Sequence, residues 1–150
     1  ICQEVTVDPP SFGKLPILYC ASGTEGVTIR LRQQLNENSK MLCWHHVIPE
    51  MNHNELVGWK QDYKNVAVVL LRNKDDYERT QKRMEFSKQV FSGHTDTIIE
   101  VFSKGESAIE KTYYLIHLCD WVSYLLAEKK QIDASEVNVI VSLKSELANL

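Results

Sequence analysis

Two side chains stand where they could move protons, and both lie in short polar segments between apolar runs. Glu37 lies near the C-terminal end of a helical pattern, and His53 comes shortly after a predicted strand. The negative end of a helix dipole disfavours an ionised carboxylate by about 0.3–1 kcal/mol, which suits Glu37 to act as a general base. The alternative is that Lys40 pairs with Glu37 in an ordinary surface ion pair.

The segment around His53 also has a purely structural interpretation. Asn52 and Glu55 have the spacing of a capping box, in which two side chains satisfy free N–H groups at the start of a helix. Capping explains those two residues. It does not explain His53 or Asn54, since exposed side chains of these types gain little in a first helical turn.

Apolar runs and helical patterns alternate along the chain and must position these residues. This alternation predicts an α/β fold: a three-layer, flavodoxin-like sandwich with a four- to five-stranded parallel sheet between helices. The run Val66–Leu71 is apolar on both faces, so it predicts an interior strand. The expected strands are 15–20, 42–48, 65–71 and 97–102, and the expected helices are 27–34, 52–59, 75–91, 106–128 and 135–147.

The chain reads as one domain over residues 1–150, in which residues 1–14 are a connector or an edge strand. Asp133 or Ser135 is expected to cap the last helix. In open α/β sheets, ligands bind beyond the carboxyl ends of the strands. Glu37 and His53 lie on connections after different strands, so we expect them at the same edge of the sheet.

Composition excludes several classes of function. Net charge is −3, which gives no electrostatic footprint for nucleic acid or for a membrane surface. No apolar run approaches the roughly 20 residues of a membrane span. Adjacent strand residues point to opposite faces, so His45 and His46 cannot chelate a metal together, and no other group has metal-ligand spacing.

Four cysteines are present without CxxC spacing: Cys2, Cys20, Cys43 and Cys119. Three of them lie in apolar stretches, where a free cysteine behaves as a small hydrophobic residue. We therefore expect reduced thiols and a cytoplasmic location, with no disulfide.

Several segments resemble the bifunctional phosphoglucose/phosphomannose isomerases, a branch of the sugar isomerase (SIS) family. They are QLNENSK at 34–40, PEMNHNELVGW at 49–59, YYLIHLCDWVSYLLAEKKQIDASEV at 113–137 and VSLKSEL at 141–147. The resemblance extends from about Leu15 to the end of the chain, and N-H-N-E-x-x-G-W is its most specific part. It implies an SIS-type domain and a hexose 6-phosphate substrate.

The resemblance also implies residue roles. Glu37 matches the base that moves a proton between C1 and C2 of the open-chain sugar through a cis-enediol. His53 matches the histidine that helps to open the sugar ring, which this family supplies across a homodimer interface. Lys144 matches a C-terminal lysine that approaches the ring oxygen. The alternative is that Lys144 is an ordinary solvated lysine near a helix end. No cofactor is implied.

The chain departs from the complete family pattern, because the full enzyme has two SIS halves and this chain matches the C-terminal, base-carrying one. The main phosphate loop and the arginine that steadies the enediolate are expected in the other half, so the isolated chain should be incomplete. Ser22, Gly23 and Thr24 have the right types for a phosphate-binding turn, although a simple strand-to-helix turn explains them equally well. Ser135 or Val137 falls near the position tied to mannose tolerance.

Two other functions compete with the isomerase. One is a non-catalytic SIS module that senses a sugar phosphate, which would not be expected to keep Glu37, His53 and Lys144 together. The other is a nucleotide-binding domain, which the absence of G-x-G-x-x-G and G-x-x-x-x-G-K motifs disfavours.

Overall fold

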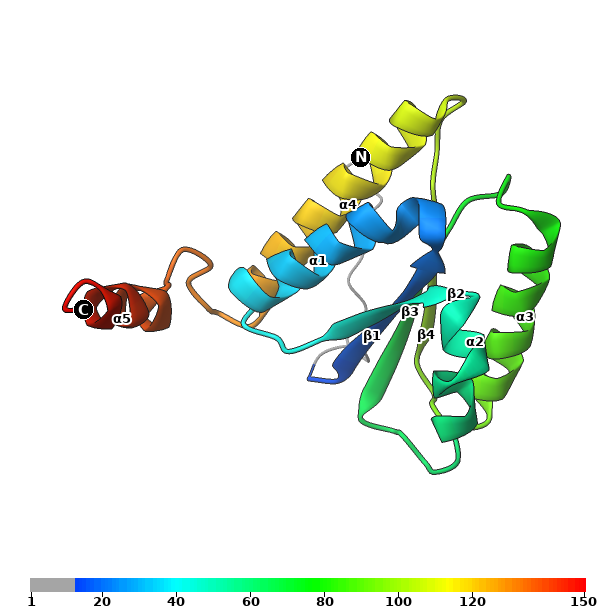
Figure 1. Cartoon of the computed structure of the whole chain (residues 1–150), viewed down its shortest axis with the longest axis horizontal. Coiled ribbons are helices and arrows are strands. Elements are labelled where there is room, and N and C mark those ends of the chain that lie inside the picture. The colour runs from blue at the N-terminus through cyan, green and yellow to red at the C-terminus, as the bar shows by residue number, and fades with distance from the viewer. Residues whose placement is uncertain (1–12) are drawn as a thin grey trace.

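Parallel strands form one sheet between two layers of helices in the computed structural model, which describes residues 13–150 (Figure 1). The first expected segment, 1–14, therefore lies almost wholly outside the described residues. The elements follow in this order: β1 Leu15–Ala21, η2 Ser22–Thr24, α1 Glu25–Glu37, β2 Trp44–Ile48, α2 Glu50–His53, η3 Glu55–Gly58, β3 Val66–Arg72, α3 Glu78–Ser92, β4 Ile98–Phe102, α4 Ala108–Lys129 and α5 Asn138–Leu147.

The described part of the chain forms a four-stranded sheet in the order β2-β1-β3-β4, with all pairs parallel. This is the beginning of the flavodoxin-like order, which confirms the predicted α/β sandwich. β3 pairs with β1 on one side and with β4 on the other, so the prediction of an interior strand at Val66–Leu71 is also confirmed.

Each face of the sheet carries its own apolar core. On one face, β1 and β3 pack against Met51 of α2, Trp59, and Met84 and Phe91 of α3. On the other face, α1 and α4 cover the sheet with a second set of leucines, valines and cysteines. Burying each large side chain contributes roughly 1.5–3 kcal/mol, so the two cores fix which helix lies on which face.

The described cysteines Cys20, Cys43 and Cys119 are free thiols. No helix between residues 13 and 150 has the length and apolar content that crossing a bilayer requires. A cytoplasmic location stays a prediction.

Two element predictions are wrong in detail. The single helix expected over 52–59 is the short α2 followed by the 3-10 turn η3, with Asn54 between them in a non-helical conformation (φ −124°, ψ −62°). The last helix begins at Asn138 rather than at 135, and Val137 precedes it without a side-chain cap. Asp133 instead accepts hydrogen bonds from the backbone N–H and the hydroxyl of Ser135.

The helix α5 projects away from the rest of the molecule, beyond the end of α1 (Figure 1). None of its residues is buried, and its sequence is rich in valine, isoleucine and leucine. The segment that joins it to α4 is held by the ammonium group of Lys40, which donates to the carbonyl oxygen of Glu136. The position of α5 is therefore set at its base rather than along its length.

Candidate functional site

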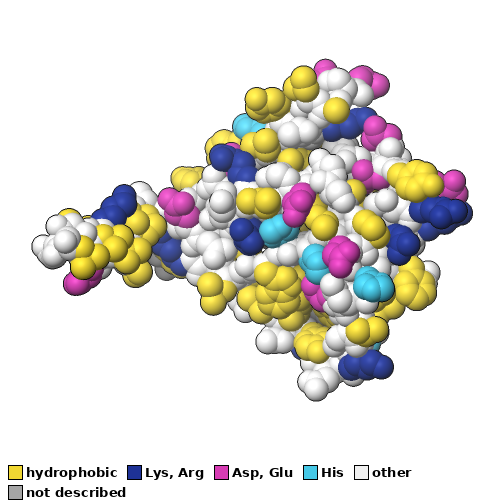
Figure 2. All heavy atoms as spheres, viewed as in Figure 1, with side chains coloured by type: hydrophobic (Ala, Val, Ile, Leu, Met, Phe, Trp, Pro, Cys, Tyr) yellow, Lys and Arg dark blue, Asp and Glu magenta, His cyan; other side chains and the backbone are white. Residues whose placement is uncertain are grey.

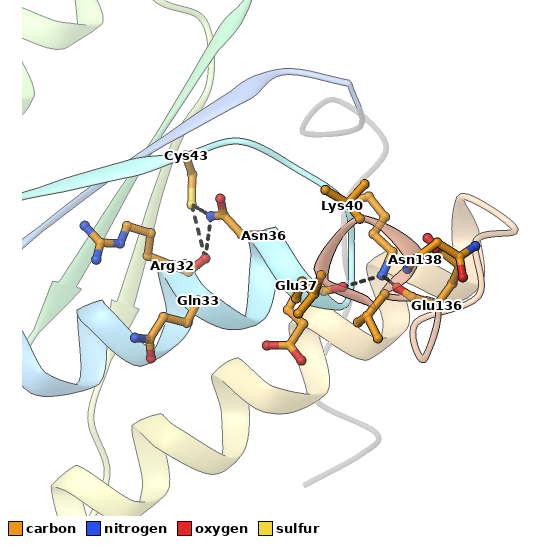
Figure 3. Close-up of a pocket in the computed structure, with 11 residues that line it drawn as sticks. Arg32, Gln33, Asn36, Glu37, Lys40, Cys43, Glu136 and Asn138 are labelled. Carbon is orange, nitrogen blue, oxygen red and sulfur yellow. Dashed lines mark hydrogen bonds between the residues drawn. The ribbon is translucent and has the colours of Figure 1, made fainter. Parts of the chain in front are cut away.

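An open hollow of about 660 Å³ lies where α1 ends and the chain enters α5 (Figure 3). One wall is the last turns of α1 with Lys40 and Cys43, and the other is the segment 136–140. The lining residues are Arg32, Gln33, Asn36, Glu37, Lys40, Cys43, Glu136, Val137, Asn138, Val139 and Ile140. Apolar atoms make up much of its surface, but the lining also includes two carboxylates, two cations and three side-chain amides, which are groups that can bind the hydroxyls of a sugar.

Glu37 is the last residue of α1, as the sequence predicts, and its side chain is exposed on the wall of this hollow. The Lys40 ammonium does not pair with its carboxylate. It donates instead to the backbone carbonyl of Glu37 at 2.6 Å, and so satisfies the free end of the helix. The interpretation of Glu37 as half of a surface ion pair with Lys40 is therefore wrong, and Figure 3 shows the carboxylate turned away from that ammonium.

The backbone around Lys40 brings the two walls together. Lys40 has a positive φ of 51°, which turns the chain sharply after α1, and its side chain bridges the carbonyls of Glu37 and Glu136. Lys144 lies on α5 one helical turn beyond Ile140, a residue that lines the hollow. The structure thus brings Glu37 and the Lys144-bearing helix to the same end of the molecule.

Arg32 and Asn36 belong to this hollow, although the sequence alone did not identify them. The side-chain amide of Asn36 donates to the carbonyl of Arg32 at 2.6 Å and contacts the Cys43 sulfur at 3.4 Å. Burial raises the pKa of Cys43 to about 11, so its thiol is protonated at neutral pH and is not a nucleophile. The available signal was the helical spacing, since Arg32 and Asn36 lie one turn apart on the helix that carries Glu37.

His53 ends α2, and its side chain is exposed. The residues around it are fixed: Met51 is fully buried, and the amide of Asn52 donates to the Ser87 hydroxyl at 2.7 Å. Asn54 accepts from the backbone N–H of Glu55 at 2.5 Å. The expected capping box is therefore wrong, because Asn52 binds α3 and Asn54 makes the only side-chain cap recorded for η3 among the described residues.

The Glu55 carboxylate is instead bound to the sheet. Its Oε1 accepts a hydrogen bond from the hydroxyl of Tyr19, and its Oε2 lies 2.8 Å from Nδ1 of His46. Burial and the Glu55 contact both raise the pKa of Tyr19, so the phenol stays neutral and donates. We call Tyr19, His46 and Glu55 the Glu55 clamp. It attaches the turn that follows His53 to β1 and β2.

His45 and His46 point to opposite faces of the sheet, as predicted. His46 joins the Glu55 clamp, whereas Nδ1 of His45 lies 3.2 Å from Arg32 and its Nε2 lies 3.5 Å from Glu25 on the other face. The register agrees, because His45 stands beside Leu18 and His46 beside Tyr19, which belong to different cores.

Glu37 lies at the amino ends of the strands and His53 at their carboxyl ends, so the expectation that both lie at the carboxyl ends is wrong. The helix α1 starts at the carboxyl end of β1 and returns across one face, and its 13 residues carry the chain back by roughly 20 Å. Glu37 therefore lies near the amino end of β2, and His53 follows its carboxyl end (Figure 1). One copy of the described chain does not place both side chains around one small ligand.

The turn Ser22–Thr24 forms the 3-10 element η2 at the carboxyl end of β1. The 660 Å³ hollow that Glu37 lines, which we call the Glu37 hollow, lies at the other end of α1. Thr24 is buried, and its hydroxyl accepts from the Asn73 amide at 3.0 Å. Gly23 and Thr24 line a small hollow of about 140 Å³ together with Asp75 and Asp76. Two carboxylates beside the turn disfavour an anion there, and Lys111 is already paired with Asp75.

A family model described as the bacterial phospho-glucose isomerase C-terminal SIS domain matches residues 11–147. A bifunctional phosphoglucose/phosphomannose isomerase from Aquifex aeolicus is 34% identical over 138 residues, covering 91% of this chain and 43% of that protein. The same enzyme from Caldicellulosiruptor bescii is 35% identical over 143 residues, covering 93% of this chain and 42% of that protein.

Solved structures agree on the fold. A glucose-6-phosphate isomerase-like protein from Thermus thermophilus superimposes with a TM-score of 0.64 at 20% identity, covering 85% of this chain and 43% of that one. The chain thus spans about two fifths of the length of the curated relatives that it matches.

Proposed function

Because the chain belongs to the family of bacterial phospho-glucose isomerase C-terminal SIS domains, we propose that it is the base-carrying half of an aldose–ketose isomerase. The substrates would be glucose 6-phosphate or mannose 6-phosphate and the product fructose 6-phosphate, as the names of its relatives imply. The observation that carries the proposal is the hollow at the end of α1, in which the Glu37 carboxylate is exposed beside the N-terminal end of α5.

Glu37 acts as the base. Its carboxylate removes the proton from C2 of the open-chain aldose, and the electron pair of that bond forms the C1=C2 bond of a cis-enediol while O1 gains a proton. Glu37 then returns its proton to C1 as O2 loses its own, which gives the ketose. The reaction transfers protons only, so it requires no redox cofactor.

His53 opens the sugar ring, and the position of His53 supports its supply by a partner subunit. Glu37 and His53 lie at opposite ends of the strands, so a homodimer is the simplest assembly that brings one chain's carboxylate to the partner's histidine. Lys144, on the helix that leaves the hollow, approaches the ring oxygen from the same subunit as Glu37.

The phosphate group and the enediolate require cationic or N–H donors beyond this hollow. The relatives are more than twice as long as this chain, and we assign the main phosphate loop and a steadying arginine to their additional SIS half. Phosphate binding at Ser22–Thr24 stays a prediction that the neighbouring Asp75 and Asp76 weaken.

Mixing two inactive variants of the full-length enzyme tests this proposal. Glu37→Gln should lower turnover by about 10²–10⁴-fold, because general base catalysis contributes that much. Dimers that pair Glu37→Gln with His53→Ala regain one intact site, so an equal mixture should recover roughly one quarter of the wild-type rate. Unchanged turnover in Glu37→Gln would show that Glu37 is not the base. A mixture without recovery would place His53 in the same subunit as Glu37.

A further inference from the structure

The residues that follow Glu37 fix the end of α1 to the rest of the molecule. The amide of Asn38 donates to the hydroxyl of Ser123 on α4 at 3.0 Å, and the Ser39 hydroxyl donates to the Ser123 carbonyl at 2.7 Å. Lys130 donates to the carbonyl of Ser39 at 2.9 Å, and Ser39 is fully buried. The backbone that carries the candidate base is therefore firmly attached to α4.

The opposite wall of the Glu37 hollow has far fewer attachments. None of the residues of α5 is buried. Among the described residues, the segment 133–150 shares one hydrogen bond with the rest of the chain, from the ammonium of Lys40 to the carbonyl oxygen of Glu136 (Figure 3). The carboxylate of Glu136 in turn accepts from the backbone N–H of Asn138, the first residue of α5, at 2.6 Å. Glu136 thus links the start of α5 to Lys40.

The side chain of Lys40 is suited to this bridge. An ammonium group has three N–H donors, and two of them are used here by the carbonyls of Glu37 and Glu136. Lys40 also holds a positive φ of 51°, a region that costs a residue other than glycine roughly 1–2 kcal/mol. A neutral or shorter side chain cannot satisfy the end of α1 and reach the second carbonyl as well.

We propose that Lys40 is a positioning residue for the isomerisation. Its ammonium group fixes the start of α5 to the end of α1, and so sets where Lys144 lies relative to Glu37. This inference rests on the proposed function. Lys144 follows Ile140 by one helical turn, and Ile140 lines the hollow. Displacing a catalytic group by about 1 Å can cost about 10²-fold in rate, so a loosened α5 would slow the reaction even though Lys40 touches no reacting atom.

The peptide bond after Glu136 gives a structural test on the 150-residue chain, because its carbonyl is the one that Lys40 binds. A protease that cuts after glutamate, with mass spectrometry of the fragments, measures how often this segment is released. Lys40→Met should speed cleavage there at least about tenfold, and cleavage after the exposed Glu106 should not change. Lys82→Met is the matched control, since Lys82 is an exposed lysine on α3 and should behave as the wild type.

Turnover in the full-length enzyme tests the link to the chemistry. Lys40→Met should lower kcat at least about tenfold and change KM less than about threefold, because the phosphate group supplies most of the binding energy. Lys40→Arg keeps a cation that can donate to both carbonyls, so kcat should return to within about threefold of the wild type. In a Lys144→Met background, Lys40→Met should cost less than about threefold more, since Lys40 acts through that helix.

Two results overturn the proposal. One is equal cleavage after Glu136 in Lys40→Met and the wild type. The other is full multiplication of the Lys40→Met and Lys144→Met losses, which would mean that Lys40 does not act through Lys144.

Circular dichroism checks folding. Should Lys40→Met fail to fold, Lys40→Gln replaces it in each comparison, because glutamine keeps an N–H donor for the end of α1 but is too short to join both carbonyls. Accelerated cleavage beside wild-type turnover in Glu37→Gln supports the hold of Lys40 on α5, and shows instead that the base of the proposed function is wrong.

Discussion

At the scale of single residues, the candidate catalytic groups are exposed and the residues that hold them are buried. The side chain of His53 is exposed, but Met51 before it and Trp59 after it are both in the core. Glu37 is exposed at a helix end whose carbonyl is satisfied by Lys40. This separation lets the chemical group meet a ligand while its backbone position is set by packing.

The Glu55 clamp gives a prediction at this scale. Glu55→Gln should reproduce the defect of His53→Ala, because both weaken ring opening: one removes the imidazole and the other releases the turn that follows it. In the full-length enzyme, turnover of the cyclic sugar phosphate should fall about tenfold or more, and turnover of an open-chain analogue should change little.

Parallel assays of the two substrates measure this selectivity. Glu50→Gln is the matched control, since Glu50 is exposed on the same short helix and accepts a long hydrogen bond of 3.4 Å from the Asn54 amide. If His53→Ala shows the selective loss and Glu55→Gln does not, the clamp has no role in positioning His53.

At the scale of elements, the edge strand β4 is joined to α3 by a cluster of charges. The guanidinium of Arg72 contacts the carboxylates of Glu85 and Glu100, and the ammonium of Lys88 contacts Glu100 from α3. Arg72 is 5% exposed, so its charge depends on these carboxylates rather than on water. The cluster therefore fixes the helix on this face of the sheet independently of the apolar core.

The cluster predicts a loss of stability in acid. Burial on its own raises the pKa of Glu100, but its contacts with Lys88 and Arg72 outweigh burial and hold that pKa below its usual value. A lowered pKa contributes stability above the unfolded pKa of about 4.3, and this stability is lost as pH falls through the folded pKa. Glu100→Gln should thus cost about 1–3 kcal/mol at pH 7 and progressively less below pH 4.

Urea unfolding at several pH values measures both effects. Glu78→Gln is the control, because Glu78 forms an exposed i,i+4 pair with Lys82 on the same helix and should cost no more than roughly 0.5 kcal/mol. A Glu100→Gln protein with the same pH dependence as the wild type would contradict the assigned cause.

At the scale of the whole molecule, the described chain is one folded α/β unit whose proposed site is an open hollow (Figure 2). The Glu37 hollow is bounded by α1 and the N-terminal end of α5, and none of the residues of α5 is buried. The proposed phosphate and arginine groups are assigned to an additional half, and the proposed histidine to a second copy. Binding energy from the distant phosphate is what would hold a sugar against the base.

The 150-residue chain on its own should therefore convert fructose 6-phosphate at a negligible rate. A coupled assay for glucose 6-phosphate formation measures this directly, with the full-length enzyme as the positive control. Robust activity that Glu37→Gln abolishes would instead mean that the turn Ser22–Thr24 or another group in this chain binds the phosphate.

The sequence by itself determined the order of strands and helices, the interior position of β3 and the family, because these depend on local periodicity and on short motifs. It missed the break between α2 and η3 and the late start of α5, where side-chain contacts outweigh local preference. Only the tertiary structure showed that Tyr19 and Glu55, 36 residues apart, hold the His53 turn. The opposite positions of Glu37 and His53 follow from the predicted topology itself, because a helix between parallel strands returns the chain to their amino ends. Contacts such as that of Tyr19 with Glu55 could not be predicted, because they depend on the register between strands and on which side chains meet across the sheet, and local sequence patterns record neither.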